Sequence, residues 1–275
     1  MSASDMTKRM AGWLAVGLNL FLRKRDTPRL GILLYHRISP LIPDIPVPDA
    51  NVTPERFHEQ LAGLKKKNFH FLSLKEAIRR DQCGEPWPDK PLVVTFDDGF
   101  GNVFLRAYPV LCDLEIPATI FLNTAFLDQS EPFPFDSWGQ WCADTAPVPA
   151  YRPLRTEECR EMLDSDLIEI GAHTHTHQDF RGKPVELRED LNLCVADLDQ
   201  RFGIQSPTFA FPYGRVAWGY AGGELTEAAR KAFALGASRV WLHTCTLDDP
   251  AALPNYEARG FRKTRQETYQ ADLPD

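Results

Sequence analysis

The chain has 275 residues, 43% of them hydrophobic and 25% charged, so it can bury a core and does not have the composition of a disordered protein. A formal net charge of -7 argues against nucleic acid as the main partner, because phosphate binding needs a basic face. The six cysteines form no CxxC pair, which argues against a zinc ribbon and favours buried or free thiols in a reducing compartment.

Residues 1–29 are expected to form an amphipathic helical extension. Their apolar stretch, residues 13–22, is too short to span a bilayer and is followed by the basic residues 23–25. A secretory signal peptide has its charge before the apolar stretch and a small-residue cleavage site after it, so we predict no cleavable signal. We expect the helix to pack on the protein or, alternatively, to make peripheral contact with a membrane, and the chain to be cytoplasmic or membrane-peripheral.

Short apolar runs then alternate with helical patterns. Thr53 before Pro54 predicts a helix start, Ser73 with Glu76 predicts a capping box, and Gly203 predicts a helix end. Several apolar runs are continuous, which is typical of strands that are covered on both faces. The seven predicted strands are 30–35, 68–72, 91–96, 118–122, 167–172, 207–211 and 239–244.

This alternation predicts an α/β fold with parallel strands. Seven strands are too few for an eight-stranded barrel, and they suit an incomplete (β/α)7 TIM-like barrel. Two stretches are irregular. Residues 40–48 hold four prolines and predict an extended loop, and residues 128–153 are rich in Pro, Trp and Asp, as a lid or binding element often is.

Two aspartates follow the apolar run 92–94 and precede a glycine. Asp97 and Asp98 therefore lie at the carboxyl end of a strand, where barrels and open parallel sheets form their sites. A turn at Gly99 would let both carboxylates face one cavity. In isolation, the same three residues would simply predict a turn.

Histidines follow a second strand. His173 and His177 are four positions apart, so one helical turn or a tight loop places both imidazoles on one side. A lone histidine is more often structural, but three within five residues at a strand end rarely are. A catalytic zinc-type site needs about three protein ligands and an open position for water. Asp98 would complete that set and leave Asp97 free to accept a proton from the water.

A third segment, Phe209-Ala210-Phe211-Pro212-Tyr213-Gly214, begins in the predicted strand 207–211 and runs past its end. Alone it predicts a strand end and a turn. Near a metal site, its backbone amides and aromatic ring would line the pocket and stabilise an oxyanion.

Together these segments resemble a known family. T-F-D-D-G at 95–99, H-T-x-x-H at 173–177 and F-P-Y-G at 211–214 resemble, in this order, motifs of the polysaccharide deacetylases of carbohydrate esterase family four. Tyr35-His36 and the helical pattern of 53–64 match one branch of that family. The resemblance covers about residues 30–216. It implies a deformed (β/α) barrel that hydrolyses N-acetyl groups on an amino-sugar glycan or glycolipid.

The resemblance also implies roles, position by position. Asp97 matches the catalytic base, and the Tyr213 amide matches the oxyanion donor. The implied ligands of a divalent metal, which we expect to be zinc, are Asp98, His173 and His177. The candidate substrate-binding residues are His36, Phe211, Pro212 and Trp138.

The chain departs from the family pattern at three points. Ala210 stands where many relatives carry an arginine that orients the base. The fourth motif has no counterpart. The fifth is only approximated by Leu242-His243, so His243 is either a general acid for the leaving amine or a structural residue.

The C-terminal segment, residues 217–275, has a sequence pattern that differs from that of the deacetylase-like part before it. A helical pattern over 224–236, the strand 239–244 and Y-x-x-x-G-F at 256–261 resemble the C-terminal half of the GNAT acetyltransferases. We expect this atypical α-β-α tail to complete the barrel as its last unit. The alternative is a recombined tail that packs loosely.

The leading prediction is a metal-dependent polysaccharide deacetylase, a hydrolase acting on carbon–nitrogen bonds other than peptide bonds. A glycan-binding protein of the same fold that has lost turnover, because of Ala210 and the altered tail, is the alternative from another class. A third interpretation is an acetyltransferase remnant that binds CoA.

Overall fold

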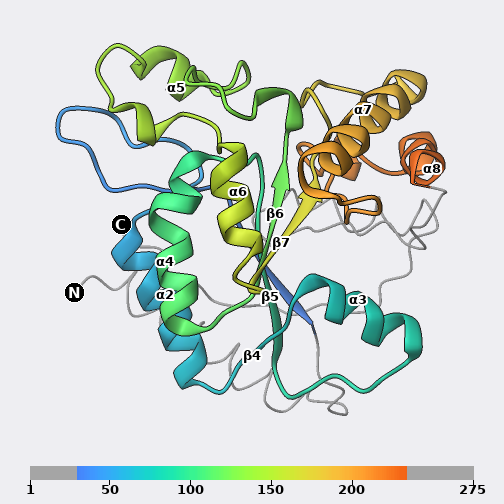
Figure 1. Ribbon diagram of the computed structural model, residues 1–275, viewed down its shortest axis with the longest axis horizontal. Helices are drawn as coiled ribbons and strands as arrows, with labels where there is room; N and C mark the ends of the chain where they lie inside the picture. The colour runs from blue at the N-terminus through green and yellow to red at the C-terminus, as the bar shows by residue number, and fades with distance from the viewer. Residues whose placement is uncertain (1–29, 234–275) are drawn as a thin grey trace, which may run out of the picture.

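The protein is an α/β structure built on a parallel sheet, as the sequence predicts. The computed structural model describes residues 30–233 (Figure 1). All pairings within the main sheet are parallel, and β4 pairs only with the first residues of β5. In spatial order the sheet consists of β1 (Gly31–Tyr35), β5 (Pro91–Phe96), β6 (Ala118–Leu122) and β7 (Ile168–Ala172), with β4 (His70–Phe71) beside the start of β5.

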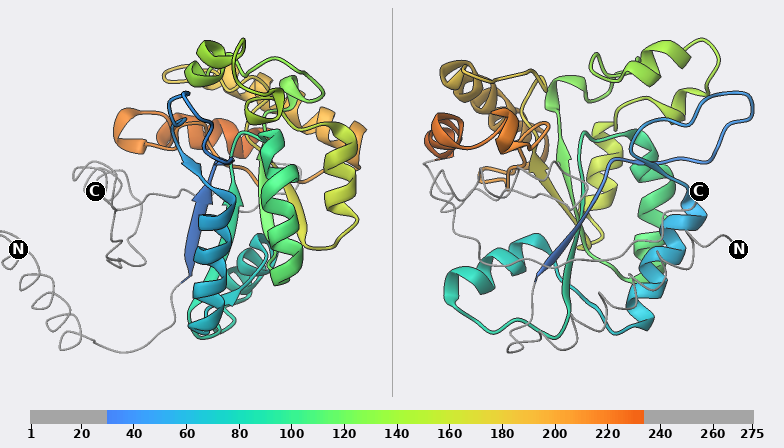
Figure 2. Two further views of the ribbon diagram at one scale, coloured as in Figure 1. Left: turned by 90° about the vertical axis from the view of Figure 1, so that its left-hand side faces the viewer. Right: turned by 180° about the vertical axis from the view of Figure 1, so that it is seen from behind.

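Helices α2, α4 and α6 lie side by side (Figures 1 and 2). Helices α7 and α8 pack against each other on the side of β7 away from these three helices. The α-helices are α2 (Pro54–Lys66), α3 (Leu74–Cys83), α4 (Tyr108–Leu114), α5 (Ser137–Cys142), α6 (Thr156–Leu163), α7 (Pro184–Phe202) and α8 (Gly223–Ala232). The smaller elements are the parallel pair β2 (Arg37–Ile38) and β3 (Asn51–Val52), the π-helical turn η1 (Val103–Ala107), and the 3-10 turns η2 (Thr124–Phe126), η3 (Val148–Ala150) and η4 (Val216–Trp218).

Local chemistry sets the helix boundaries. The Thr53 hydroxyl accepts a hydrogen bond from the Arg56 amide at 3.3 Å, and the Ser73 hydroxyl accepts one from the Glu76 amide at 3.2 Å, as N-caps do. Gly203 has φ 69 and ends α7 in the left-handed conformation that glycine adopts without steric cost. These three predicted boundaries are confirmed.

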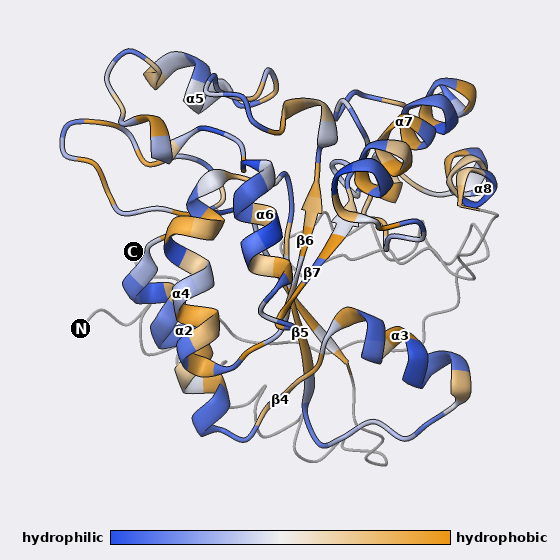
Figure 3. Ribbon diagram, in the orientation of Figure 1, coloured by the Kyte–Doolittle hydropathy of each residue, from blue (hydrophilic) through white to orange (hydrophobic). Residues whose placement is uncertain are grey.

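The core lies between the sheet and its helices. Every residue of β5 and β6 is buried, which agrees with their continuous apolar sequences (Figure 3). Leu225 and Ala229 of α8 belong to the same core cluster as Leu191 of α7. Residues 223–232 therefore pack into the core of the sheet rather than apart from it.

Some predicted elements differ from the structure. Segment 207–211, predicted as a strand, makes only a single parallel bridge, between Phe209 and Ala172. Pro207 begins the segment and Pro212 follows it, and a proline lacks the N–H that would extend a ladder. Residues 128–153, for which no period was found, contain α5 and η3, and helices α4 and α6 were not predicted at all.

Several predictions lie outside the described residues 30–233. They are the helical extension 1–29, the strand 239–244, His243 and most of the tail, so closure of a seven-stranded barrel stays a prediction. Within 30–233, no helix has both the length and the apolar character needed to cross a membrane. The five described cysteines are free thiols, and three of them are buried.

Candidate metal centre

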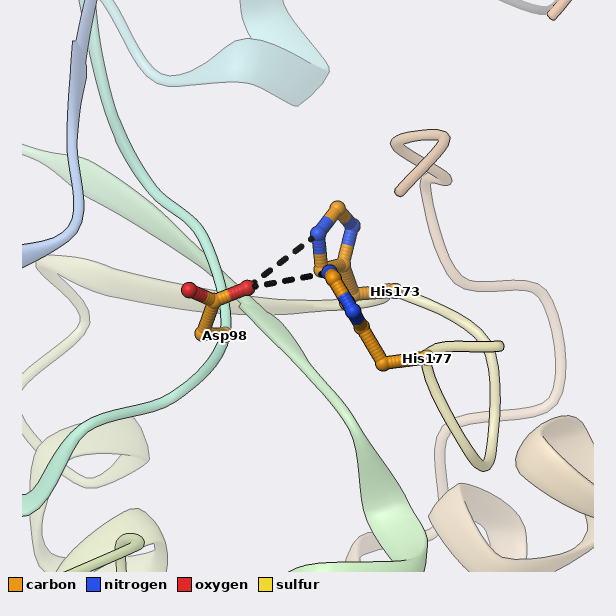
Figure 4. Close-up of side chains that lie close together, drawn as sticks. All are labelled: Asp98, His173 and His177. Atoms are coloured by element: carbon orange, nitrogen blue, oxygen red, sulfur yellow. Dashed lines mark ion pairs between the residues drawn. The ribbon is translucent and has the colours of Figure 1, made fainter. Parts of the chain in front are cut away.

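The carboxyl ends of two strands bring the predicted residues together. Asp97 and Asp98 directly follow β5, whereas His173 and His177 lie in the loop after β7. Asp98 has φ 71, and this left-handed turn after the strand lets both carboxylates approach one imidazole. His173 Nε2 lies 3.5 Å from Asp98 Oδ1 and 3.9 Å from Asp97 Oδ2. Figure 4 shows the Asp98 carboxylate facing both imidazoles.

Asp98, His173 and His177 have the spacing of three ligands of one metal ion. Asp98 Oδ1 lies 3.5 Å from His173 Nε2 and 3.4 Å from His177 Nε2. Ligands bound at about 2.0–2.2 Å in a tetrahedron lie roughly 3.3–3.6 Å from one another. One potential ligand atom from each side chain lies within 4.8 Å of the other two, and all three residues are buried. The geometry therefore fits a divalent cation with three protein ligands.

The other nitrogen of each ring supports the same interpretation. His173 Nδ1 lies 2.9 Å from the Ala210 carbonyl oxygen, which can only accept, so Nδ1 carries a proton, and Nε2 presents its lone pair when the ring is neutral. His177 Nδ1 is buried and has no hydrogen-bond partner among the described residues. A buried histidine kept only for structure would have its polar atoms paired. This ring fits better as a ligand.

Burial and charge set the protonation of these groups. Burial and the charge of His173 lower the pKa of His177 to about 3, so its ring is neutral. Burial also lowers the pKa of His173, but the Asp97 and Asp98 carboxylates outweigh burial, and the net pKa is raised. Burial raises the pKa of Asp98, yet its hydrogen bond with His173 and the nearby His36 hold it well below the usual range. Asp98 is therefore ionised.

The loop with both histidines is held in a strained conformation. Thr174 and His177 have φ 70 and 54, values that residues other than glycine rarely adopt. The Thr174 hydroxyl accepts a hydrogen bond from the His177 amide at 3.0 Å, and His175 turns its Nδ1 to the Thr124 hydroxyl at 2.8 Å. His175, which the sequence analysis left out of the ligand set, is thus engaged elsewhere.

The centre lies in a cleft of about 1310 Å³. Of the predicted substrate-binding residues, His36, Phe211 and Trp138 line this cleft, as does Tyr213, whereas Pro212 is buried and is not among the lining residues. The Trp138 ring is tied to the proline-rich loop, because its Nε1 donates a hydrogen bond to the Pro46 carbonyl at 2.6 Å.

Sequence reasoning missed three residues at the site. The Phe135 ring stacks on the His177 ring at 3.8 Å, so segment 128–153 reaches the metal centre. Arg37 forms a buried ion pair with Asp136, the next residue after Phe135. Asp190 of α7 accepts hydrogen bonds from the histidine loop. The run of aromatic residues around Phe135 was the only signal, because the other contacts join segments far apart in the sequence.

Comparison with known proteins gives a family. The sequence model of the family "Polysaccharide deacetylase" matches residues 84–232, more than half of the chain. The poly-beta-1,6-N-acetyl-D-glucosamine N-deacetylase of Staphylococcus aureus (strain MRSA252) is 25% identical over 173 residues, which are 60% of this chain and 54% of that protein. The chain thus spans about half the length of this curated relative.

Solved structures show the same fold. IcaB from Ammonifex degensii superposes with a TM-score of 0.60 at 24% identity, over 74% of this chain and 80% of that one. The Streptococcus pyogenes deacetylase PplD, solved with acetate, gives a TM-score of 0.59 at 22% identity, over 76% and 82% of the two chains. Sequence identities this low establish the fold alone, and the chemistry has to be argued from the residues of the cleft.

Proposed function

The chain belongs to the polysaccharide deacetylase family, and from this premise we propose that it is a metal-dependent hydrolase that removes N-acetyl groups from an amino-sugar glycan or glycolipid. The observation that carries the proposal is the convergence of Asp98, His173 and His177 beside Asp97, at the carboxyl ends of parallel strands. Poly-N-acetylglucosamine is the first substrate to test, because the curated relative is named for it.

Asp98, His173 and His177 would hold the cation, and two nitrogens with one carboxylate oxygen favour zinc. When bound, the cation supplies Lewis acidity to a water molecule and to the amide carbonyl. His177 is ready to bind because its ring is neutral, with a pKa of about 3. The Ala210 carbonyl keeps His173 in the tautomer that leaves Nε2 free.

Asp97 would act as the general base. It lies beside the cation ligands, 3.9 Å from His173 Nε2, and lines the cleft. Asp97 takes a proton from water as the water oxygen bonds to the amide carbonyl carbon, and the Tyr213 amide donates to the developing oxyanion. The carbon–nitrogen bond then breaks, acetate forms, and the amine leaves with a proton from Asp97 or from His243, which lies outside the described residues.

The remaining wall of the cleft would position the sugar. His36, Phe211 and Trp138 line it, and Phe135 holds the His177 ring from the side of segment 128–153. We also propose that residues beyond 233 supply the last unit of a seven-stranded TIM-like barrel. The packing of α8 into the main core supports this, because α8 leads directly into that segment.

Acetate release tests the proposal. The full chain is incubated with poly-β-1,6-N-acetylglucosamine, with added Zn²⁺ and after chelation. Release that is lost on chelation and restored by metal supports the proposal. Absence of release under every metal condition refutes it.

One observation favours a second function, a glycan-binding protein without turnover. Ala210 stands where the family pattern has an arginine that orients the base, so the chemistry could be lost while the cleft persists. Retained glycan binding without acetate release would identify this case. CoA binding by the tail also stays a prediction, and the absence of a CoA-induced melting shift would remove it.

A further inference from the structure

A row of aromatic rings leads from the metal centre to the rim of the cleft. The Tyr213 ring lies 4.8 Å from the His177 ring in an edge contact, and the Tyr220 ring lies 4.7 Å beyond Tyr213. Tyr213 is 46% exposed although it touches a buried ligand histidine, so the row connects the centre with solvent. Both tyrosines line the same cleft as the metal ligands.

Trp218 extends this rim from a fixed turn. Its side chain is 50% exposed and also lines the cleft. The Arg215 carbonyl accepts hydrogen bonds from the amides of Trp218 and Tyr220, both at 3.1 Å, and Gly219 adopts the left-handed φ of 79 between them. Val216, only 1% exposed, anchors the turn in the core. The two aromatic residues are therefore presented by a turn that is fixed before any ligand binds.

Two guanidinium groups lie over these aromatic rings. Arg215 lies 4.3 Å from the Trp218 ring, and Arg181 lies 4.2 Å from the Tyr220 ring. Arg181 is held by the Asp179 carboxylate, with Nε 3.0 Å from Oδ1. Cations over aromatic faces attract the rings and help to fix their orientation. Scattered exposed aromatics are ordinary on a protein surface, but Tyr213, Trp218 and Tyr220 all line one cleft, and the Tyr213 ring contacts His177.

The geometry points to Trp218 and Tyr220 as a subsite for the sugar ring next to the one that is deacetylated. A pyranose ring presents C–H groups on its faces, which pack on aromatic rings, and hydroxyl and acetamido oxygens at its edge, which accept from guanidinium groups. This inference rests on the proposed function and deepens it. The substrate is then a chain of N-acetylated sugars rather than a single sugar, and the rim makes the protein prefer longer chains.

The test compares chain-length preference among variants of the full-length protein. Acetate release is measured on β-1,6-linked N-acetylglucosamine oligomers from the monosaccharide to the pentasaccharide, with Zn²⁺ present. In the wild type, kcat/KM rises with length. In Trp218→Ala, the pentasaccharide-to-monosaccharide ratio of kcat/KM falls about tenfold, the effect of losing one aromatic packing contact. Trp218→Phe keeps most of the wild-type pentasaccharide-to-monosaccharide ratio, because phenylalanine still offers an aromatic ring to the sugar.

Trp141→Ala is the matched control. Trp141 is 71% exposed on α5 and is not among the residues that line the cleft, so its removal leaves the ratio at the wild-type value. A Trp218→Ala ratio equal to that of the wild type overturns the subsite while the deacetylase proposal stands.

If the wild type releases no acetate, the deacetylase proposal fails and the subsite is judged by binding alone. The affinity for the pentasaccharide is then measured by calorimetry for the same variants. About tenfold weaker binding by Trp218→Ala than by Trp141→Ala supports the subsite. Equal affinities, or no binding by the wild type, overturn it.

Discussion

The Asp190 carboxylate lies 2.5 Å from the backbone nitrogen of His175 and accepts a hydrogen bond from it. The same carboxylate accepts from the Thr176 amide at 3.2 Å and from the Thr176 hydroxyl. His175 and Thr176 lie between His173 and His177 in the sequence, so Asp190, itself buried on α7, fixes the loop that sets the separation of these two histidines. Charged acceptors give stronger bonds to backbone amides than neutral ones do.

We predict that Asp190→Asn weakens metal binding without unfolding the protein. An asparagine keeps the size of the side chain but replaces one acceptor oxygen by an NH2 donor, so either the His175 amide or the Thr176 amide loses its acceptor. The expected loss of Zn²⁺ affinity is roughly 10–100-fold, the range for outer partners of metal ligands. Competition with a chromogenic chelator measures it. Asp197→Asn on the same helix is the control, because Asp197 bonds to Arg201 instead. Equal affinities in the two variants would contradict the role of Asp190.

Asp97 and Asp98 are neighbours with separable roles. We predict that, at a pH above the titration of His173, Asp97→Asn binds Zn²⁺ with near wild-type affinity but loses roughly 10²–10⁴-fold in kcat, the contribution of a general base. Asp98→Asn is expected to lose metal binding, because it removes one of the three proposed ligands. The two variants are compared by acetate release at saturating Zn²⁺ and by metal titration. Full activity in Asp97→Asn would assign the base to another residue.

The sequence predicts this centre well for a physical reason. Parallel strands end at one edge of a sheet, so residues that follow β5 and β7 meet there even though more than seventy positions separate Asp98 from His173. His173 and His177 are only four positions apart, so their proximity can be predicted directly from the sequence. The sequence therefore predicts the three potential ligands, but their metal-binding role stays a proposal.

The supports of the centre were not predictable in the same way. Phe135 reaches His177 from an irregular segment, and Asp190 reaches the histidine loop from one face of a helix. Such contacts depend on how loops and helices pack, and a single sequence has no period that records them. Segment 207–211 was predicted as a strand but makes a single bridge at Phe209 for a related reason. An apolar run predicts burial, but it does not predict how many hydrogen bonds the segment forms with its neighbouring strand.

The affinity for metal should rise as the pH rises. Asp97 and Asp98 raise the pKa of His173 despite its burial, so in the metal-free protein this ring holds a proton above the usual range of histidine, and a cation must displace it. His177, with a pKa of about 3, releases no proton near neutrality. Zn²⁺ affinity is therefore expected to rise by up to about tenfold per pH unit below the pKa of His173 and to level off above it.

Calorimetry in buffers with different ionisation enthalpies measures the accompanying proton release, which is expected below the raised pKa of His173 and should vanish well above it. Asp97→Asn removes one of the charges that raise the pKa of His173, so it should shift the rise in affinity to lower pH. A pH-independent affinity between about pH 5.5 and 7.5 would show that His173 is already neutral in the metal-free protein.

The ion pair between Arg37 and Asp136 should stabilise the cleft wall only while both partners are present. Their side chains are 4% and 6% exposed, and Arg37 also lies 4.0 Å from the Phe100 ring and donates to the Ala150 carbonyl. Arg37→Met leaves the Asp136 carboxylate buried without its cation, so we expect a loss of about 3–5 kcal/mol in the free energy of unfolding. Arg37→Met with Asp136→Leu removes both charges and should recover part of that loss.

Urea unfolding of the single and double variants measures this coupling. The exposed Arg79, which pairs with Glu76 and Glu85, is the control, and Arg79→Met should lower the free energy of unfolding much less than Arg37→Met does, because water screens its ion pairs. Asp136 follows Phe135, so Arg37→Met should also loosen the stacking on His177 and weaken Zn²⁺ binding. If the double variant is less stable than Arg37→Met, the broken ion pair does not explain the lower free energy of unfolding. The lost packing of the arginine on Phe100 would then explain it.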